Sequence, residues 1–409
     1  PRGPVFCGGP KHLSPAATKL PRLMPYGQVF QSHALHFFYL ASPDLLFGMD
    51  APVEKRNVVA VAVENRELAV KGITMRKFGQ EIIKAVAGKR IHGILAVPGG
   101  VHKTFTKQER DYFMDGKQIE NIDTMIEWSR AIIQFMKDYH EKNRKLLDEF
   151  AAFPSGHLGM VNDAGGLDLY DGKLRAIDSE GNITLDDIST DLYEEYFSEA
   201  VAQWSYMKFP YLKKIGREKG WNRVGPLARI NMCSHITTPL AEKERQDFMA
   251  FTGHKVNNST LYSHWARLIE VLHCAEEMKL LLNDPELLDS DLVRSGTARL
   301  KGIGIIEAPR GTLTHHYEVD EKGMITRCNL IVSTTHNNDA MNTAVKWVAN
   351  NVISNKGNIT EGMLNQVEVA IRAYDPCLSC ATQAMGKMPL KVELYNHNGD
   401  LINEKYKNG

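Results

Sequence analysis

The stretch NIDTMIEWSRAIIQFMKDYHEKNRKLLDEF, residues 121–150, carries the clearest periodic pattern in the chain. Its apolar residues recur at spacings of three to seven, with charged residues between them: Ile122, Ile126, Ile133, Met136 and Tyr139. This spacing predicts an amphipathic helix that lays one face against a core. At about 1.5 Å per residue the helix would be roughly 45 Å long, which is long enough to be the spine of a helical bundle.

The segments on either side of this stretch predict further helices, with small hairpins between them. The first 26 residues are so rich in Pro and Gly that we expect a loop there. Helical patterns cover residues 28–46, 72–86, 191–204, 259–282, 339–353 and 361–374, and a short apolar strand covers 91–97. Alternating runs separated by turn residues predict hairpins within 167–183, 303–333 and 389–406. The strands do not alternate regularly with helices, so the expected fold class is α+β and predominantly helical, without a doubly wound parallel sheet.

The composition excludes several functional classes. The chain has 409 residues, with 49 Lys and Arg against 49 Asp and Glu, so it lacks the overall basic charge of a nucleic-acid-binding protein. No apolar run approaches the ~20 residues that span a bilayer, so no membrane span is expected. Six cysteines are too few for a disulfide scaffold of this length, and we expect a reducing, cytoplasmic setting.

The sharpest local motif is DPCLSC, residues 375–380, directly after a predicted helix. A Cys-x-x-Cys bend brings two sulfurs together, and soft thiolates suit zinc, copper, nickel and iron. Pro376 would stop the preceding helix. From these residues alone, a metal site, a redox dithiol and two inert cysteines all stay open, and a metal would need further ligands from elsewhere.

Two more segments carry polar residues in unusual concentration. EAPRGT, residues 307–312, places an Arg on a turn between Pro and Gly. The adjacent residues His315 and His316 follow on a predicted strand, so their side chains face opposite sides of it. The simplest interpretation of this segment is a surface turn with a solvated Arg, followed by one buried and one exposed His. VSTTHNN, residues 332–338, lies between a strand and a helix, where such residues either cap the helix or face a ligand.

Taken together in this order, the motifs resemble the large subunit of nickel–iron hydrogenases. Further matching stretches, most similar to the cytoplasmic, bidirectional, NAD-coupled branch, are residues 31–34 (QSHA), 89–93 (KRIHG), 97–100 (VPGG), 204–210 (WSYMKFP) and 223–229 (RVGPLAR). The resemblance implies that family's helical core with small peripheral β-hairpins. It also implies reversible oxidation of dihydrogen at a nickel–iron centre whose iron carries carbonyl and cyanide ligands.

The resemblance assigns roles to individual residues. Cys377 would be a terminal nickel ligand and proton acceptor, Cys380 a ligand that bridges to the iron, and Arg310 a catalytic guanidinium over the open metal position. Pro309 and Thr334 would contact the cyanides and Asp375 would orient Arg310. His33, within the matching 31–34 stretch, would belong to the shell around the site. No separate cofactor-binding residues are implied.

The chain departs from the family's pattern at both ends. The first metal motif of the family reads Arg-x-Cys-Gly-x-Cys, whereas Pro4 and Val5 replace its first Cys and its Gly, and Cys7 alone keeps the second Cys position. The chain also starts at Pro1, so we expect an incomplete or variant N-terminus. Gln383 replaces the His that closes the last motif and helps to bind a structural magnesium, which puts a magnesium site in doubt.

These observations lead to one main expectation and two alternatives. We expect residues 1–383 to form the hydrogenase-like unit and residues 384–409 to be a tail that a maturation protease could remove. By resemblance, the partners are a flavin module that reduces NAD or NADP and a small iron–sulfur subunit. A metal-free scaffold subunit of a redox complex is the first alternative, and an unrelated zinc or dithiol protein is the second.

Overall fold

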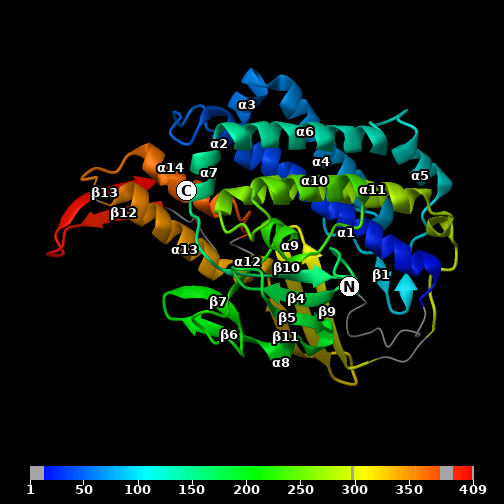
Figure 1. Cartoon of the computed structure of the whole chain (residues 1–409). Helices are drawn as coiled ribbons and strands as arrows, with labels where there is room; N and C mark the ends of the chain where they lie inside the picture. Colours follow the sequence, from blue (N-terminus) through cyan, green and yellow to red (C-terminus); the bar gives the residue numbers. More distant parts are fainter. Residues whose placement is uncertain (1–12, 296–298, 355, 378–389, 408–409) are drawn as a thin grey trace.

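The computed structural model describes residues 13–295, 299–354, 356–377 and 390–407. Its helices gather on one side of the molecule and most of its strands lie on the other (Figure 1). The principal helices are α1 (Pro15–Leu35), α4 (Arg66–Ala87), α6 (Ile122–Lys142), α10 (Pro239–Phe251), α11 (Ser263–Asn283), α13 (Asn338–Val348) and α14 (Glu361–Arg372). Shorter helices are α2 (Ser42–Phe47), α3 (Val58–Glu64), α5 (Lys107–Met114), α7 (Arg144–Glu149), α8 (Tyr193–Tyr196), α9 (Pro226–Met232) and α12 (Ser333–His336). The predicted helix-rich α+β fold class is confirmed.

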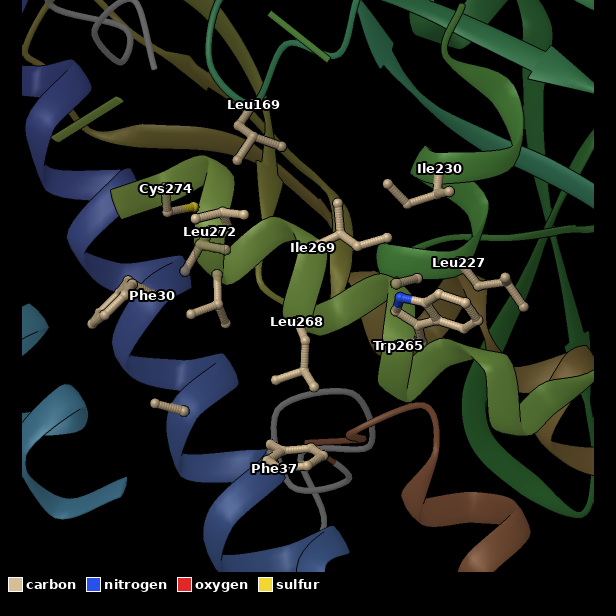
Figure 2. Packing of buried hydrophobic residues seen from close by; sticks show 14 of the residues in the cluster. Phe30, Phe37, Leu169, Leu227, Ile230, Trp265, Leu268, Ile269, Leu272 and Cys274 are labelled. Atoms are coloured by element: carbon tan, nitrogen blue, oxygen red, sulfur yellow. The ribbon is translucent and has the colours of Figure 1, made fainter. Parts of the chain in front are cut away.

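Helix α11 is the spine of the helical side. It packs against α1, α6, α9 and α10, and every residue from Ser263 to Glu276 is buried. Figure 2 shows side chains of α11, among them Trp265 and Leu268, lying between Phe37, which follows α1, and Leu227 of α9. A helix that is buried nearly all round belongs inside a core, whereas an amphipathic helix covers one. The predicted spine, residues 121–150, is therefore wrong in that role, because its one-sided pattern makes it a covering helix.

Small sheets make up the other side. The strands β3 (Gly156–Val161), β4 (Lys173–Ile177), β5 (Ile183–Ile188) and β8 (Asn222–Arg223) form one sheet in the order β5-β4-β3-β8, in which only β3 and β8 run parallel. The second is an antiparallel sheet of β9 (Lys301–Ala308), β10 (Gly311–Val319) and β11 (Ile325–Ile331). A small apolar cluster that includes Leu158, Leu174 and Ile305 joins the two sheets.

Three two-stranded hairpins complete the described part of the fold. They are β1 (Ala96–Val97) with β2 (Gly100–Val101), β6 (Phe197–Ala202) with β7 (Ser205–Leu212), and β12 (Leu390–Tyr395) with β13 (Leu401–Lys407). The predicted hairpins within 303–333 and 389–406 are confirmed. The hairpin expected within 167–183 lies farther along the chain, because β4 and β5 pair over residues 173–188. Val392 and Leu394 of β12 pack against the main core, so the last hairpin adheres to the body of the protein.

Four element predictions are wrong at their ends or in their type. The strand expected over residues 91–97 is confined to Ala96–Val97 of β1, and residues 91–95 form no strand. The loop expected up to residue 26 gives way to α1, which begins at Pro15 because Ser14 caps it through a bond from the Ala17 amide, and buried packing retains Pro21 and Pro25 inside it. The expected helix 121–150 breaks at Asn143, whose side-chain amide donates to the Tyr139 carbonyl. The expected helix 191–204 stops at Tyr196 and continues as β6.

Among the residues that the structure describes, no helix combines the length and apolar character needed to cross a membrane.

Buried histidines make the stability of this fold dependent on pH. His140 of α6 lies among the rings of Phe251, Tyr262 and Trp265, and neither ring nitrogen has a hydrogen-bond partner among the described residues. Burial lowers the pKa of His140 from its usual 6.5 to about 3. The folded protein thus keeps this ring neutral where the unfolded chain protonates it, so its contribution is complete above pH 6.5 and is lost as the pH falls toward 3.

We expect His140→Leu to reduce this acid sensitivity. Between pH 7 and 5 the variant should lose about 2 kcal/mol less of its free energy of unfolding than the wild type does. Urea titrations at both pH values measure the difference. His397→Leu, at an exposed position in the last hairpin, is the matched control and should keep the wild-type pH dependence. An unchanged pH dependence in His140→Leu would contradict the prediction.

Candidate metal centre

The Pro309-Arg310 pair forms a two-residue turn between β9 and β10, where Ala308 pairs with Gly311. Gly311 has φ +128°, and a Cβ there would lie 2.3 Å from a methyl carbon of Val224. Only glycine allows both this backbone conformation and so close an approach. The turn that presents Arg310 is therefore locked against the neighbouring 223–225 loop, and the interpretation of Arg310 as a freely solvated surface residue is wrong.

The Arg310 side chain turns toward the segment that follows α14. Its Nε donates to the Asp375 carbonyl at 2.5 Å, and its Nη2 lies 3.4 Å from the Asp375 carboxylate. The Asp375 backbone is left-handed, with φ +52°, and precedes Pro376. Such backbone strain in a buried residue that is not glycine is common at functional sites.

Asp375 is an unusual buried acid. Burial raises its pKa above the usual value, against the opposing effect of the Arg310 and Arg267 charges. Its Oδ2 atom has no hydrogen-bond partner among the described residues. One carboxylate oxygen thus holds Arg310 while the other has no partner in the part of the chain that the structure describes, which is the arrangement expected for a residue that orients Arg310.

The polar cluster at 332–338 joins this site to its surroundings. The Cys377 amide donates to the Thr334 hydroxyl at 3.1 Å, and Ser333 donates to the Gly311 carbonyl at 2.7 Å. Asn337 bonds both backbone groups of Val224. None of these side chains caps a helix, so the capping interpretation of this cluster is wrong.

A fully buried ion network lies behind the turn. Arg229 of α9 donates to both carboxylate oxygens of Glu270 at 2.6 Å and to Glu307 at 2.8 Å. Glu270 also lies 2.8 Å from His33 Nε2. Burial lowers the pKa of His33 to about 4, so the ring is neutral near pH 7. Burial alone would raise the pKa of Glu270, but Arg229 and His33 outweigh it and lower this pKa to about 2.

The sequence did not single out Arg229 or Glu270 as site residues. The available signal was Glu270 inside the apolar run LIEVL, residues 268–272, because a charged residue in a buried helix requires a partner. Its partners come from positions 33 and 229, which only the fold brings together. His33 thus belongs to the surroundings of the site through Glu270 and Arg229.

Two further buried arginines lack a carboxylate partner among the described residues. Arg267 donates to the Ala373 carbonyl at 2.9 Å and its Nε has no partner there. Burial lowers the pKa of Arg267 to about 10, so it stays protonated near neutral pH. Arg223 lies 4.0 Å over the Phe153 ring, and two of its nitrogens have no partner there either. A buried guanidinium that forms no ion pair with a carboxylate would be stabilised by an anionic group bound nearby.

The described residues contain one of the three proposed metal ligands. Cys377 is described, whereas Cys7, Cys380 and the doubtful magnesium position Gln383 lie outside the described residues. Within the described part of the chain, no group of three or more His, Cys, Asp or Glu residues is arranged to hold a metal. Burial raises the pKa of Cys233 to about 12, so this residue stays a thiol and is a poor substitute ligand.

Comparison with known proteins agrees with this geometry. The family model described as "Nickel-dependent hydrogenase" matches residues 171–383. The beta chain of the NAD-reducing hydrogenase HoxS from Cupriavidus necator is 47% identical over 96% of this chain and 81% of its own length. The chain belongs to the nickel-dependent hydrogenases. As a member of this family it is an oxidoreductase that interconverts dihydrogen with protons and electrons.

Further hydrogenases extend the comparison. An F420-non-reducing hydrogenase chain from Methanococcus voltae is 38% identical over 93% of this chain and 79% of its own length. A crystal structure of NAD+-reducing [NiFe]-hydrogenase superposes with a TM-score of 0.88 at 48% identity, covering 92% of this chain and 82% of that one. A Ni-Fe-Se hydrogenase from D. vulgaris Hildenborough shares the fold, with a TM-score of 0.69 at 18% identity, over 92% of this chain and 84% of that one. The metal-free scaffold alternative is not favoured.

In this hydrogenase the matched region includes most of the predicted site. Arg310, Thr334, Asp375 and Cys377 lie in it and are connected by the hydrogen bonds described above. His33 lies outside it and reaches the turn through the ion network. His316, by contrast, bonds Tyr193 and Glu318, away from the turn, which agrees with a structural role.

Proposed function

We propose that this hydrogenase holds a nickel–iron centre with carbonyl and cyanide ligands on the iron. Cys377, together with Cys380 and Cys7, would hold this centre through their thiolates. The observation that carries the proposal is the convergence of Cys377, Thr334, Asp375 and Arg310 from three separate segments. When bound, the centre supplies the polarising metal chemistry that splits dihydrogen.

The charges of the described residues support such a group. Thiolates and cyanides are anions, and Arg310, Arg267 and Arg223 bring three guanidinium groups to this region. Of the three, only Arg310 forms an ion pair with a described carboxylate, at 3.4 Å, although the charges of Asp375 and Glu270 also act on Arg267. Placing an anionic centre beside these cations lowers the cost of burying both.

The protein's own residues would then have separate roles in the reaction. Cys377 Sγ would accept the proton released from dihydrogen, because a thiolate can take up a proton. Arg310 provides a positive charge at the site. Asp375 holds that charge in place, and Thr334 fixes the Cys377 backbone. We assign to the Thr334 hydroxyl and to Pro309 the role of contacting the cyanide ligands of the iron.

Electron transfer requires partner subunits. The Cupriavidus necator relative is part of an NAD-reducing hydrogenase. We propose that this chain likewise binds a small iron–sulfur subunit, and that it works with a flavin module that reduces NAD or NADP. Six cysteines cannot supply both the active site and a chain of clusters.

The test uses the chain produced together with its partner subunits and maturation enzymes. We expect stoichiometric nickel and iron in the purified complex, and dihydrogen-dependent reduction of NAD or NADP. A folded complex with only zinc would overturn the metal proposal. Nickel, iron and dye reduction by dihydrogen, with neither nicotinamide reduced, would overturn only the NAD coupling.

A further inference from the structure

Arg229 contacts the backbone of the turn that carries Arg310. Its Nη1 donates to the Ala308 carbonyl at 2.8 Å and its Nη2 reaches the Pro309 carbonyl at 3.3 Å. The Pro309 carbonyl belongs to the same planar peptide unit as the Arg310 nitrogen. A guanidinium that holds this oxygen therefore limits how the peptide plane of Arg310 can rotate.

The guanidinium itself is held firmly. Both oxygens of Glu270 accept from it at 2.6 Å, and Glu307 accepts at 2.8 Å. Glu307 precedes the turn and also accepts from the Thr312 hydroxyl, which follows the turn, at 2.7 Å. The side chain of Arg229 is fully buried. A guanidinium fixed by two acids thus holds the end of β9 and the turn, and Glu307 links it to Thr312 at the start of β10.

We propose that Arg229 is a positioning residue that sets the direction of Arg310 by fixing the turn's carbonyls. The inference rests on the proposed function, since it assigns Arg310 to the site of dihydrogen chemistry. Arg229 itself touches Ala308 and Pro309 backbone and two carboxylates, and it acts on the reaction only through Arg310.

Lysine is the informative replacement for Arg229. It keeps the positive charge beside Glu270 and Glu307 but cannot hold two acids and two carbonyls in the geometry of a planar fork. The turn would then lose an anchor while the network keeps its charge balance. A small misplacement of a group at a reacting centre costs about 10- to 100-fold in rate. We therefore expect Arg229→Lys to lower kcat by that factor, with little change in the KM for dihydrogen.

A double-mutant cycle with Arg310→Lys tests whether Arg229 acts through Arg310. The measurement is kcat for dihydrogen oxidation by the loaded complex of both single variants and the double variant. If the proposal holds, Arg229→Lys has an effect below about 3-fold once Arg310 is already Lys, because coupled residues are not additive. Losses that multiply would overturn it. A wild-type complex without nickel or hydrogenase activity would instead overturn the proposed function.

Two readouts do not depend on activity. Nickel content of Arg229→Lys should match the wild type, and hydrogen–deuterium exchange should accelerate in the peptide that covers residues 305–314. Unchanged exchange there, with normal activity, would overturn the inference. Equal acceleration throughout the protein would also overturn it, because it would indicate a general loss of stability.

A second variant and a control keep the test independent of folding. Glu307→Gln removes one anchor of Arg229 with almost no change in volume, and we expect a smaller loss in kcat, also absent in the Arg310→Lys background. Arg245→Lys on α10 alters another largely buried ion pair, with Glu242 at 2.9 Å, that does not touch the turn. It should leave kcat and the exchange of residues 305–314 unchanged, and a loss equal to that of Arg229→Lys would overturn the inference.

Discussion

Cys377→Ser is expected to abolish both nickel binding and hydrogen oxidation. A serine hydroxyl stays protonated near neutral pH, so it offers neither the soft anionic ligand that nickel requires nor a base for the released proton. Changes to groups that merely support a metal ligand already cost about 10- to 100-fold, so loss of the ligand itself should cost more. The bond from the residue 377 amide to Thr334 involves the backbone and survives the change.

Nickel analysis and hydrogen-dependent dye reduction measure the effect of Cys377→Ser. Cys328→Ser is the matched control, because Cys328 is an exposed free thiol on β11. It should retain wild-type nickel and activity. Normal nickel and activity in Cys377→Ser would rule out the assigned role.

Arg310→Lys is expected to lower kcat by about 100- to 1,000-fold while nickel stays bound, since loss of one well-placed donor at a reacting centre has this effect. Arg310 uses two nitrogens at once, Nε toward the Asp375 carbonyl and Nη2 toward its carboxylate. A lysine ammonium is a single point of charge and cannot keep both contacts with the same reach.

Steady-state kinetics and metal analysis of the same preparation test this prediction. Arg327→Lys is the control, since Arg327 is a half-exposed residue of β11 that pairs with Glu194 and Glu318. Its kcat should stay at the wild-type value. A wild-type kcat in Arg310→Lys would show that the guanidinium is not needed over the site.

The parts of the site that could be predicted from sequence are those encoded by neighbouring residues. DPC at 375–377 and PRG at 309–311 each combine a turn residue with a chemical group, so a few adjacent residues indicate both the local backbone and the chemistry. The strand-to-helix segment at 333–338 could be found for the same reason. The role of this segment could not be predicted, because whether Thr334 caps a helix or bonds Cys377 depends on residues more than forty positions away.

The features that could not be predicted from the sequence depend on tertiary packing. Residues 15–26 look like a loop because of their prolines, yet burial against α4 and α11 stabilises a helix there. Residues 191–204 have helical spacing, yet pairing with β7 draws the second half into a strand. The Arg229 network joins positions 33, 229, 270 and 307, and no local pattern relates them.

The burial of α11 also has a consequence for attempts to make this enzyme more robust. The same helix supplies the apolar centre of the fold and the charged residues Arg267 and Glu270. Replacing a buried ion network by well-packed apolar residues often raises stability. Selection for heat resistance alone would therefore favour joint apolar replacement of Glu270 and its partner Arg229, which would remove charge from the surroundings of Arg310. In α11, thermostability and catalysis compete for the same side chains, so a useful library must screen for both at once.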